Sequence, residues 1–196
     1  MVIYSKASTE GVDKHPYFVR KQLNNPYDVR ITDYLVLNRL VSSLVVPIRS
    51  FSNAIQGIQL IFAEKIDFGN RKPRDKHIIG TLKGNFFLMG ILANQERYIV
   101  CEGLATGYAL FQSSFYTTLC CLTCKNYYPV VKRLIQHYPR STILIACDND
   151  LETIANPGIQ EANKIQREFS NVKITIPPSL NGKSVDFNDL YCRGIA

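Results

Sequence analysis

Residues 97–107, RYIVCEGLATG, form a short apolar run that stops at Glu102 and is followed at once by Gly103. A second stretch of the same form, residues 142–150 (TILIACDND), also passes from apolar residues into acidic ones. Short apolar runs bounded by turn residues are typical of buried β-strands. We therefore predict a buried strand in each place, with carboxylates at its carboxyl end.

Strands and helices alternate through this half of the chain. Buried strands are predicted at residues 98–101, 117–122, 142–147 and 172–176. The helix before the third strand begins with Asn126 as a candidate N-cap and Pro129 in its first turn, and Asn156-Pro157 opens the next helix. Such alternation implies right-handed crossovers and a parallel sheet covered on both faces. The predicted fold class is α/β, with a four-stranded parallel sheet and helices on both faces.

The first half of the chain predicts a different unit. Residues 44–48 (LVVPI) and 55–63 (IQGIQLIFA) read as strands of an antiparallel sheet, and Pro47 favours a sheet edge or a strand end. We therefore divide the chain into a basic, mostly β unit at residues 1–95 and the α/β unit at residues 96–196.

Charge and composition favour an anionic partner. The chain has 196 residues, 46% of them hydrophobic, and 23 Lys and Arg against 16 Asp and Glu give a net charge of +7. A basic surface of this kind favours nucleic acid, although a solvated surface has the same composition. No secretory signal opens the chain and no apolar run reaches the roughly 20 residues of a membrane span. We expect a reduced, cytoplasmic, soluble protein with no membrane partner.

The acidic residues at the strand ends suggest a metal site. Asp148 and Asp150 are two residues apart, so both carboxylates can turn toward one cation, and Glu102 ends another strand of the same sheet. Ligands bind at the carboxyl ends of strands in open α/β sheets. Carboxylate oxygens suit Mg²⁺ or Mn²⁺, although turns and helix caps use the same residues.

Cysteines invite a competing interpretation. Cys121 and Cys124 form a C-x-x-C spacing together with Cys120. A structural zinc ion needs four ligands, and no second Cys or His pair follows at a usual spacing. The sequence therefore favours cysteines that act as small apolar core residues.

Two segments of the amino-terminal half gather cations. HPYFVRK at residues 15–21 could contact phosphate and base, or could pack on the domain as an extended arm, which composition alone favours. The most basic stretch contains Lys65, Arg71, Lys72, Arg74, Lys76, His77 and Lys83. Beside a metal site, such a loop favours phosphate binding over a merely solvated surface.

Taken together, these motifs resemble the Toprim domain of primases, topoisomerases and certain nucleases. The finer likeness is to the Toprim-type primases of conjugative plasmids and phages. The motifs that carry it are HPYFVRK at 15–21, VPIR at 46–49, Gln59, GNRK at 69–72, KGNFF at 83–87 before Gly90, EGLAT at 102–106, IACDND at 145–150, NPG at 156–158 and DFNDL at 186–190.

The resemblance implies a Rossmann-like Toprim fold and Mg²⁺-dependent joining of ribonucleotides into a short primer on single-stranded DNA. It implies metal binding by Asp148 and Asp150, and a role for Glu102 as a further ligand or an acid/base group. The residues implied to contact DNA or nucleoside triphosphates are His15, Arg20, Lys21, Arg71, Lys72, Arg74 and Lys83. Supporting roles are implied for Gly103, Asp186, Asn188 and Asp189.

Departures from the family pattern leave alternatives open. Residues 123–126 (TCKN) replace an acidic, glycine-containing turn, and no zinc-binding or helicase module accompanies the catalytic motifs. The chain is therefore expected to work with a helicase, relaxase or other replication protein, or to be a remnant with less activity. The competing functions are a Toprim nuclease and a non-catalytic single-stranded-DNA-binding module.

Overall fold

The computed structural model describes residues 2–69, 72–149, 156–179 and 184–195. It divides the chain into two compact units, Met1–Leu82 and Lys83–Ala196. The first is an antiparallel β unit and the second is an α/β unit built on a mostly parallel sheet, which confirms the predicted fold class. The boundary between the two units follows Leu82 and therefore precedes the predicted boundary at 95/96. None of the helices in the described part of the chain has the length and apolar character that crossing a membrane requires.

The amino-terminal unit is a four-stranded antiparallel sheet with the order β1-β2-β3-β4. Its strands are β1 (Arg30–Val36), β2 (Arg39–Arg49), β3 (Ile55–Ile66) and β4 (Arg74–Gly80). Pro47 lies in β2 beyond Val45, the last β2 residue that pairs with β1. One side of β2 is therefore a local sheet edge at Pro47, where the missing N–H is tolerated, as the sequence predicted.

Three short helical segments precede this sheet: α1 (Val2–Lys6), the 3₁₀ turn η1 (Val12–Lys14) and α2 (Pro16–Lys21). Tyr4 of α1 is buried in the core on one face of the sheet, beside Val45, Leu60 and Phe62. The segment HPYFVRK forms α2 rather than an extended arm, because Pro16 occupies the first helical position and His15 caps it. The predicted extended arm is therefore wrong.

The carboxyl-terminal unit contains a five-stranded sheet with the order β5-β7-β6-β8-β9. The four predicted strands are β6 (Arg97–Cys101), β7 (Thr118–Cys120), β8 (Thr142–Ala146) and β9 (Val172–Thr175), and they are mutually parallel. The fifth, β5 (Phe87–Met89), runs antiparallel to β7 at the sheet edge. This pairing places residues 83–95 with the second unit, which is why the boundary lies at Leu82.

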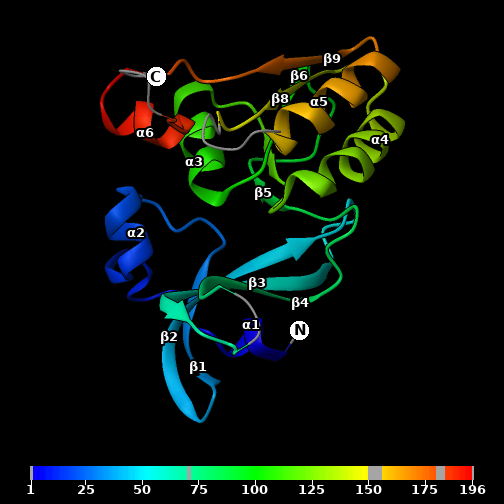
Figure 1. Cartoon of the computed structure of the whole chain (residues 1–196). Coiled ribbons are helices and arrows are strands. Elements are labelled where there is room, and N and C mark those ends of the chain that lie inside the picture. The colour runs from blue at the N-terminus through cyan, green and yellow to red at the C-terminus, as the bar shows by residue number, and fades with distance from the viewer. Residues whose placement is uncertain (1, 70–71, 150–155, 180–183, 196) are drawn as a thin grey trace. The chain divides into compact units, whose positions relative to one another are not determined.

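Helices cover both faces of this sheet (Figure 1). α3 (Leu104–Ser114) packs against α6 (Phe187–Cys192) on one face, and α4 (Tyr127–His137) packs against α5 (Pro157–Glu168) on the other. This placement is the outcome of right-handed crossovers between parallel strands.

Gly107 allows α3 to lie close to the sheet. A Cβ atom at this position would lie 2.2 Å from Cys120 Sγ and 3.1 Å from Cys101 Sγ. Both thiols are buried and belong to the adjacent strands β7 and β6. The packing of α3 therefore requires the absence of a side chain at residue 107, and α3 in turn carries residues of the candidate site.

Candidate functional site

Glu102 and Asp148 follow the neighbouring parallel strands β6 and β8. In the register of this pair Cys101 is opposite Ala146, so Glu102 is level with Cys147 and Asp148 lies one residue further along. Both acidic residues are partly exposed, whereas the strands that carry them are mostly buried. The structure therefore brings the two predicted acids to the same carboxyl edge of the sheet. Asp150 lies outside the described residues.

Cys147 lies between the end of β8 and Asp148, and its side chain is buried. Burial, together with the negative charges of Asp148 and Glu102, raises the pKa of the Cys147 thiol to about 12. The negative charges of both carboxylates therefore act on the same buried thiol.

A hydroxyl on α3 orients Asp148. The Thr106 Oγ1 donates to Asp148 Oδ1 over 3.2 Å, and Thr106 is only 3% exposed. The Asn156 side-chain amide also donates to the backbone oxygen of Asp148 over 3.4 Å. A hydrogen bond to one carboxylate oxygen favours the charged form and fixes the rotamer. Thr106 is part of the EGLAT motif, but the sequence predicts no role for it. The only feature of the sequence that points to such a role is its position four residues after Glu102, in the first turn of α3.

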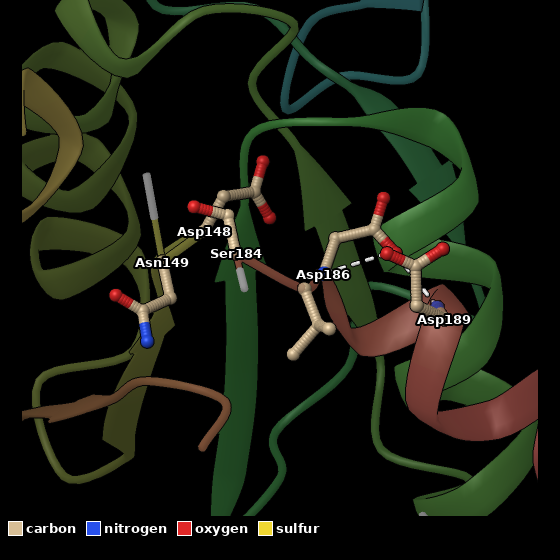
Figure 2. A pocket seen from close by; sticks show the side chains of 6 residues that line it. Asp148, Asn149, Ser184, Asp186 and Asp189 are labelled. Carbon is tan, nitrogen blue, oxygen red and sulfur yellow. Dashed lines mark hydrogen bonds between the residues drawn. The ribbon is translucent and has the colours of Figure 1, made fainter. Parts of the chain in front are cut away.

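A pocket of about 200 Å³ opens beside Asp148 and is lined by Asp148, Asn149, Ser184, Val185, Asp186 and Asp189 (Figure 2). Asp186 and Asp189 form a capping box at the start of α6: Asp189 N donates to Asp186 Oδ1 over 2.7 Å and Asp186 N donates to Asp189 Oδ2 over 3.1 Å. The structure thus brings two of the predicted supporting acids to the pocket of Asp148.

The two other supporting residues lie elsewhere in the same unit. Asn188 is 1% exposed inside α6 and does not line the pocket. Gly103 is the N-cap of α3, with φ of −93°, so its backbone does not require glycine. The position that does require glycine is Gly107, inside α3, where a Cβ atom would overlap Cys120 Sγ.

The predicted cations belong to both units. Lys83 is exposed and precedes β5, whose first residue Phe87 pairs with Cys120 at the end of β7. Because β5 is antiparallel to β7, the first residue of β5 lies at the end of the sheet where the parallel strands have their carboxyl ends. Lys83, four residues before β5, therefore lies at the same end of the sheet as Glu102 and Asp148. Of the other predicted cations, Arg20, Lys21, Lys72 and Arg74 lie in the amino-terminal unit, and Arg71 lies outside the described residues.

Two of the predicted cations of the amino-terminal unit, Arg20 and Arg74, interact with other side chains of the same unit. The guanidinium of Arg20 lies 3.7 Å from the carboxylate of Asp75. The guanidinium of Arg74 stacks over the Phe68 ring at 4.8 Å, and its buried Nε has no hydrogen-bond partner in the described part of the chain. Lys72 is exposed.

His15 has a structural position. It is 2% exposed, its Nδ1 accepts a hydrogen bond from Tyr17 N over 3.2 Å, and Nε2 lies 3.4 Å from the Ser42 carbonyl oxygen. Burial lowers the pKa of His15 below its usual 6.5, which favours the neutral ring that can accept this bond. The ring therefore caps α2, and contact of His15 with nucleic acid is no part of the function proposed below.

The donor set fits a hard cation with few protein ligands. Over residues 2–69, 72–149, 156–179 and 184–195, no three His, Cys, Asp or Glu side chains group closely enough to hold a metal by themselves. Mg²⁺ is usually bound through one or two carboxylates together with water and substrate phosphates. Asp148 and Glu102 match this requirement.

Comparison with known proteins gives a match in structure only. No family model matches the sequence, and no curated protein sequence matches it significantly. The RNA polymerase domain of Mycobacterium tuberculosis primase DnaG is similar with a TM-score of 0.68 at 13% identity, over 99% of this chain and 77% of that one. A DnaG primase catalytic domain bound to single-stranded DNA gives 0.62 at 11% identity, over 98% and 72%.

The primase fragment of the bacteriophage T7 primase-helicase protein is also similar, with a TM-score of 0.57 at 14% identity. The likeness covers 85% of this chain but only 62% of the phage fragment. The chain therefore has the fold of the Toprim-containing catalytic core of DnaG-type primases, as its motifs suggested.

Proposed function

We propose that this chain is the catalytic core of a primase, a nucleotidyltransferase that joins ribonucleotides on a single-stranded DNA template in the presence of Mg²⁺ or Mn²⁺. The observation that supports it is the meeting of Glu102 and Asp148 at the ends of β6 and β8, next to a pocket lined by Asp186 and Asp189. This arrangement occurs within the fold that the chain shares with primase cores.

In this proposal Asp148 and Asp150 hold the metal, and Glu102 is a further ligand or an acid/base group. When bound, the metal neutralises the triphosphate and orients the attacking 3′-hydroxyl. Thr106 keeps the carboxylate of Asp148 in one rotamer through its hydrogen bond. Asp186 and Asp189 add negative charge to the same pocket.

Cations supply the electrostatic partner of the substrates. We assign Lys83 to the nucleotide phosphates because it lies at the same sheet edge as the acids. Arg20, Lys21, Arg71, Lys72 and Arg74 are assigned to the backbone of the template strand. Contacts of Lys and Arg with phosphates carry affinity and make it dependent on salt.

We place this activity in plasmid or phage replication or in conjugation, in the cytoplasm, with a helicase, a relaxase or another replication protein as partner. The six cysteines are free thiols, which agrees with a reducing compartment. The plasmid and phage setting rests on the resemblance of the motifs.

The test is incubation of the protein with single-stranded DNA, labelled ribonucleoside triphosphates and Mg²⁺. Template-dependent oligoribonucleotides support the proposal. Asp148→Asn and Glu102→Gln should each lower synthesis at least about 100-fold, since they alter the metal ligands themselves. Asp33→Asn, which removes an exposed carboxylate from the amino-terminal unit, is the matched control and should leave synthesis unchanged.

Three results would contradict the proposal. Primer synthesis that survives both Asp148→Asn and Glu102→Gln would show that these carboxylates are not catalytic. Shortened DNA without oligoribonucleotides would indicate a nuclease. DNA binding without chemistry, unchanged by EDTA and by Asp148→Asn, would indicate a non-catalytic binding module.

A further inference from the structure

A buried amide connects the segment that carries Lys83 to the segment that follows β7. Asn126 is 4% exposed and ends the 3₁₀ turn η2 (Cys124–Asn126), immediately before α4. The sequence predicted Asn126 as the N-cap of α4, but its side chain makes no capping hydrogen bond there. It points to other parts of the chain instead.

The amide of Asn126 makes three hydrogen bonds to backbone atoms, two of them to residues more than 40 positions away in the sequence. Its Oδ1 accepts from Gly84 N over 2.8 Å, and its Nδ2 donates to the carbonyl oxygens of Asn85 over 2.8 Å and Cys121 over 3.1 Å. A buried side-chain amide that uses both of its ends in this way specifies the conformation of both segments, because leaving any of these groups without a partner is costly.

The turn of residues 83–85 is fixed from a second side as well. Gly84 has φ of 73°, a left-handed conformation that suits glycine. The guanidinium of Arg133 on α4 donates to the Gly84 carbonyl oxygen over 3.3 Å. Asn126 and Arg133 thus hold the backbone directly after Lys83, while the Lys83 side chain itself is exposed.

Through Cys121, the same hydrogen bonds extend to the carboxyl edge of the sheet, where Glu102 and Asp148 lie. Cys121 N donates to Cys101 O and Leu122 N donates to Glu102 O, each over 2.8 Å. Cys121, whose carbonyl oxygen binds Asn126, is therefore hydrogen-bonded to the end of the strand that leads into Glu102. A single side chain thus links the Lys83 turn to the backbone beside Glu102.

We propose that Asn126 is a positioning residue that holds Lys83 at the catalytic edge of the sheet, where the ammonium group contacts the phosphates of the incoming nucleotide. This inference rests on the proposed function, because it takes Lys83 as a nucleotide contact. Asn126 itself touches no substrate. Its effect on catalysis passes through the position of the Lys83 backbone.

The test is a double-mutant cycle of Lys83→Ala and Asn126→Ala. Two quantities are measured for each variant: the KM for ATP in primer synthesis and the Kd of a fluorescent ATP analogue without template. Each single substitution should weaken nucleotide affinity about tenfold. This is less than the roughly 100-fold effect that a displacement of about 1 Å can have on a positioned contact. The double variant should be no weaker than Lys83→Ala alone, because Asn126 has no further route to the nucleotide.

A purely structural role gives a different result. If Asn126 only stabilises the fold, Asn126→Ala lowers affinity by the same factor with and without Lys83, and the inference is wrong. Asn171→Ala is the matched control, since the Asn171 amide donates to the Ser141 carbonyl oxygen over 2.9 Å at the opposite edge of the same sheet. It should lower stability without changing the Kd of the ATP analogue.

Amide hydrogen exchange tests the hydrogen bonds of Asn126 without a measurement of primer synthesis or nucleotide binding. The Gly84 amide should exchange faster in Asn126→Ala, and its protection should be unchanged in Asn171→Ala. Arg133→Met, which removes the exposed guanidinium donor to Gly84 O, is a milder second variant for the same cycle if Asn126→Ala does not fold. Additivity between Arg133→Met and Lys83→Ala would also overturn the inference.

The outcomes separate this inference from the proposed function. Loss of affinity in Lys83→Ala together with additivity in the cycle overturns the role of Asn126 alone. An unchanged affinity in Lys83→Ala overturns both the role of Asn126 and the assignment of Lys83 to the nucleotide. Loss of primer synthesis in Asp148→Asn tests the metal site independently of either result.

Discussion

Replacing Gly107 by alanine tests how closely α3 must approach the sheet. The added methyl group would lie 2.2 Å from Cys120 Sγ and 3.1 Å from Cys101 Sγ, both of them buried in β-strands. Neither thiol is at the end of a flexible chain, so the helix or the strands must shift. Because α3 also carries Thr106, a shift of this helix moves the hydroxyl that orients Asp148.

The expected cost follows from two opposing terms. Overpacking a core costs about 1–3 kcal/mol, and a contact this short belongs at the upper end. Alanine is a better helix former than glycine by about 1 kcal/mol, which offsets part of that cost. We therefore expect Gly107→Ala to lower the free energy of unfolding by about 2 kcal/mol, or about 10 °C in Tm for a unit of this size.

The assay is urea unfolding followed by far-UV circular dichroism, with hydrogen exchange of β6 and β7 amides to report the carboxyl-terminal unit separately. The matched control is Gly158→Ala in α5, where a Cβ would have only ordinary contacts at 3.8 Å and 3.9 Å. It should be neutral or slightly stabilising. The reasoning is refuted if Gly107→Ala is as stable as Gly158→Ala, or if Cys120→Ala in the same chain restores none of the lost stability.

Two further predictions concern single side chains. Thr106→Val removes the hydrogen bond to Asp148 at nearly constant volume and should raise the Mg²⁺ concentration for half-maximal activity about tenfold, whereas Thr106→Ser should not; equal requirements in the two variants would contradict the positioning role. Because burial lowers the pKa of His15, the unfolded state binds the proton more readily, so the stability of the amino-terminal unit should fall as the pH drops below about 6.5. Urea midpoints between pH 7.5 and 5 measure this fall. His15→Asn keeps a capping acceptor and does not titrate in this range, so a fall of equal size in that variant would exclude His15 as its cause.

The strands of the α/β unit could be predicted because their signal is local. A strand of a parallel sheet is buried on both faces, so it needs a continuous apolar run that is visible in the sequence. The acids that follow β6 and β8 then had to lie at one edge, since parallel strands have their carboxyl ends together. This is why the sequence alone predicts that Glu102 and Asp148 lie near each other.

Partners that are distant in the sequence left no comparable signal. The apolar run that contains Phe87 is as visible as the others, but nothing local indicates that it pairs with β7. The sequence therefore predicts a boundary at 95/96, whereas the compact units divide after Leu82. Asn126 has the residue type and position of a helix cap, yet its amide binds the backbone of Gly84 and Asn85 instead. The residue type shows that a buried side-chain amide needs hydrogen-bond partners, but only the tertiary structure determines which backbone groups those partners are.

The sequence by itself determined the α/β class, the four parallel strands and the acidic edge, because periodicity, turn residues and strand ends are properties of neighbouring residues. Tertiary structure alone decided that Thr106 meets Asp148, that Asp186 and Asp189 line the pocket beside it, and that Gly107 must lack a side chain. These features depend on contacts between elements that are far apart in the chain. Such contacts arise only when helices pack onto the sheet, where close packing leaves no room for alternatives.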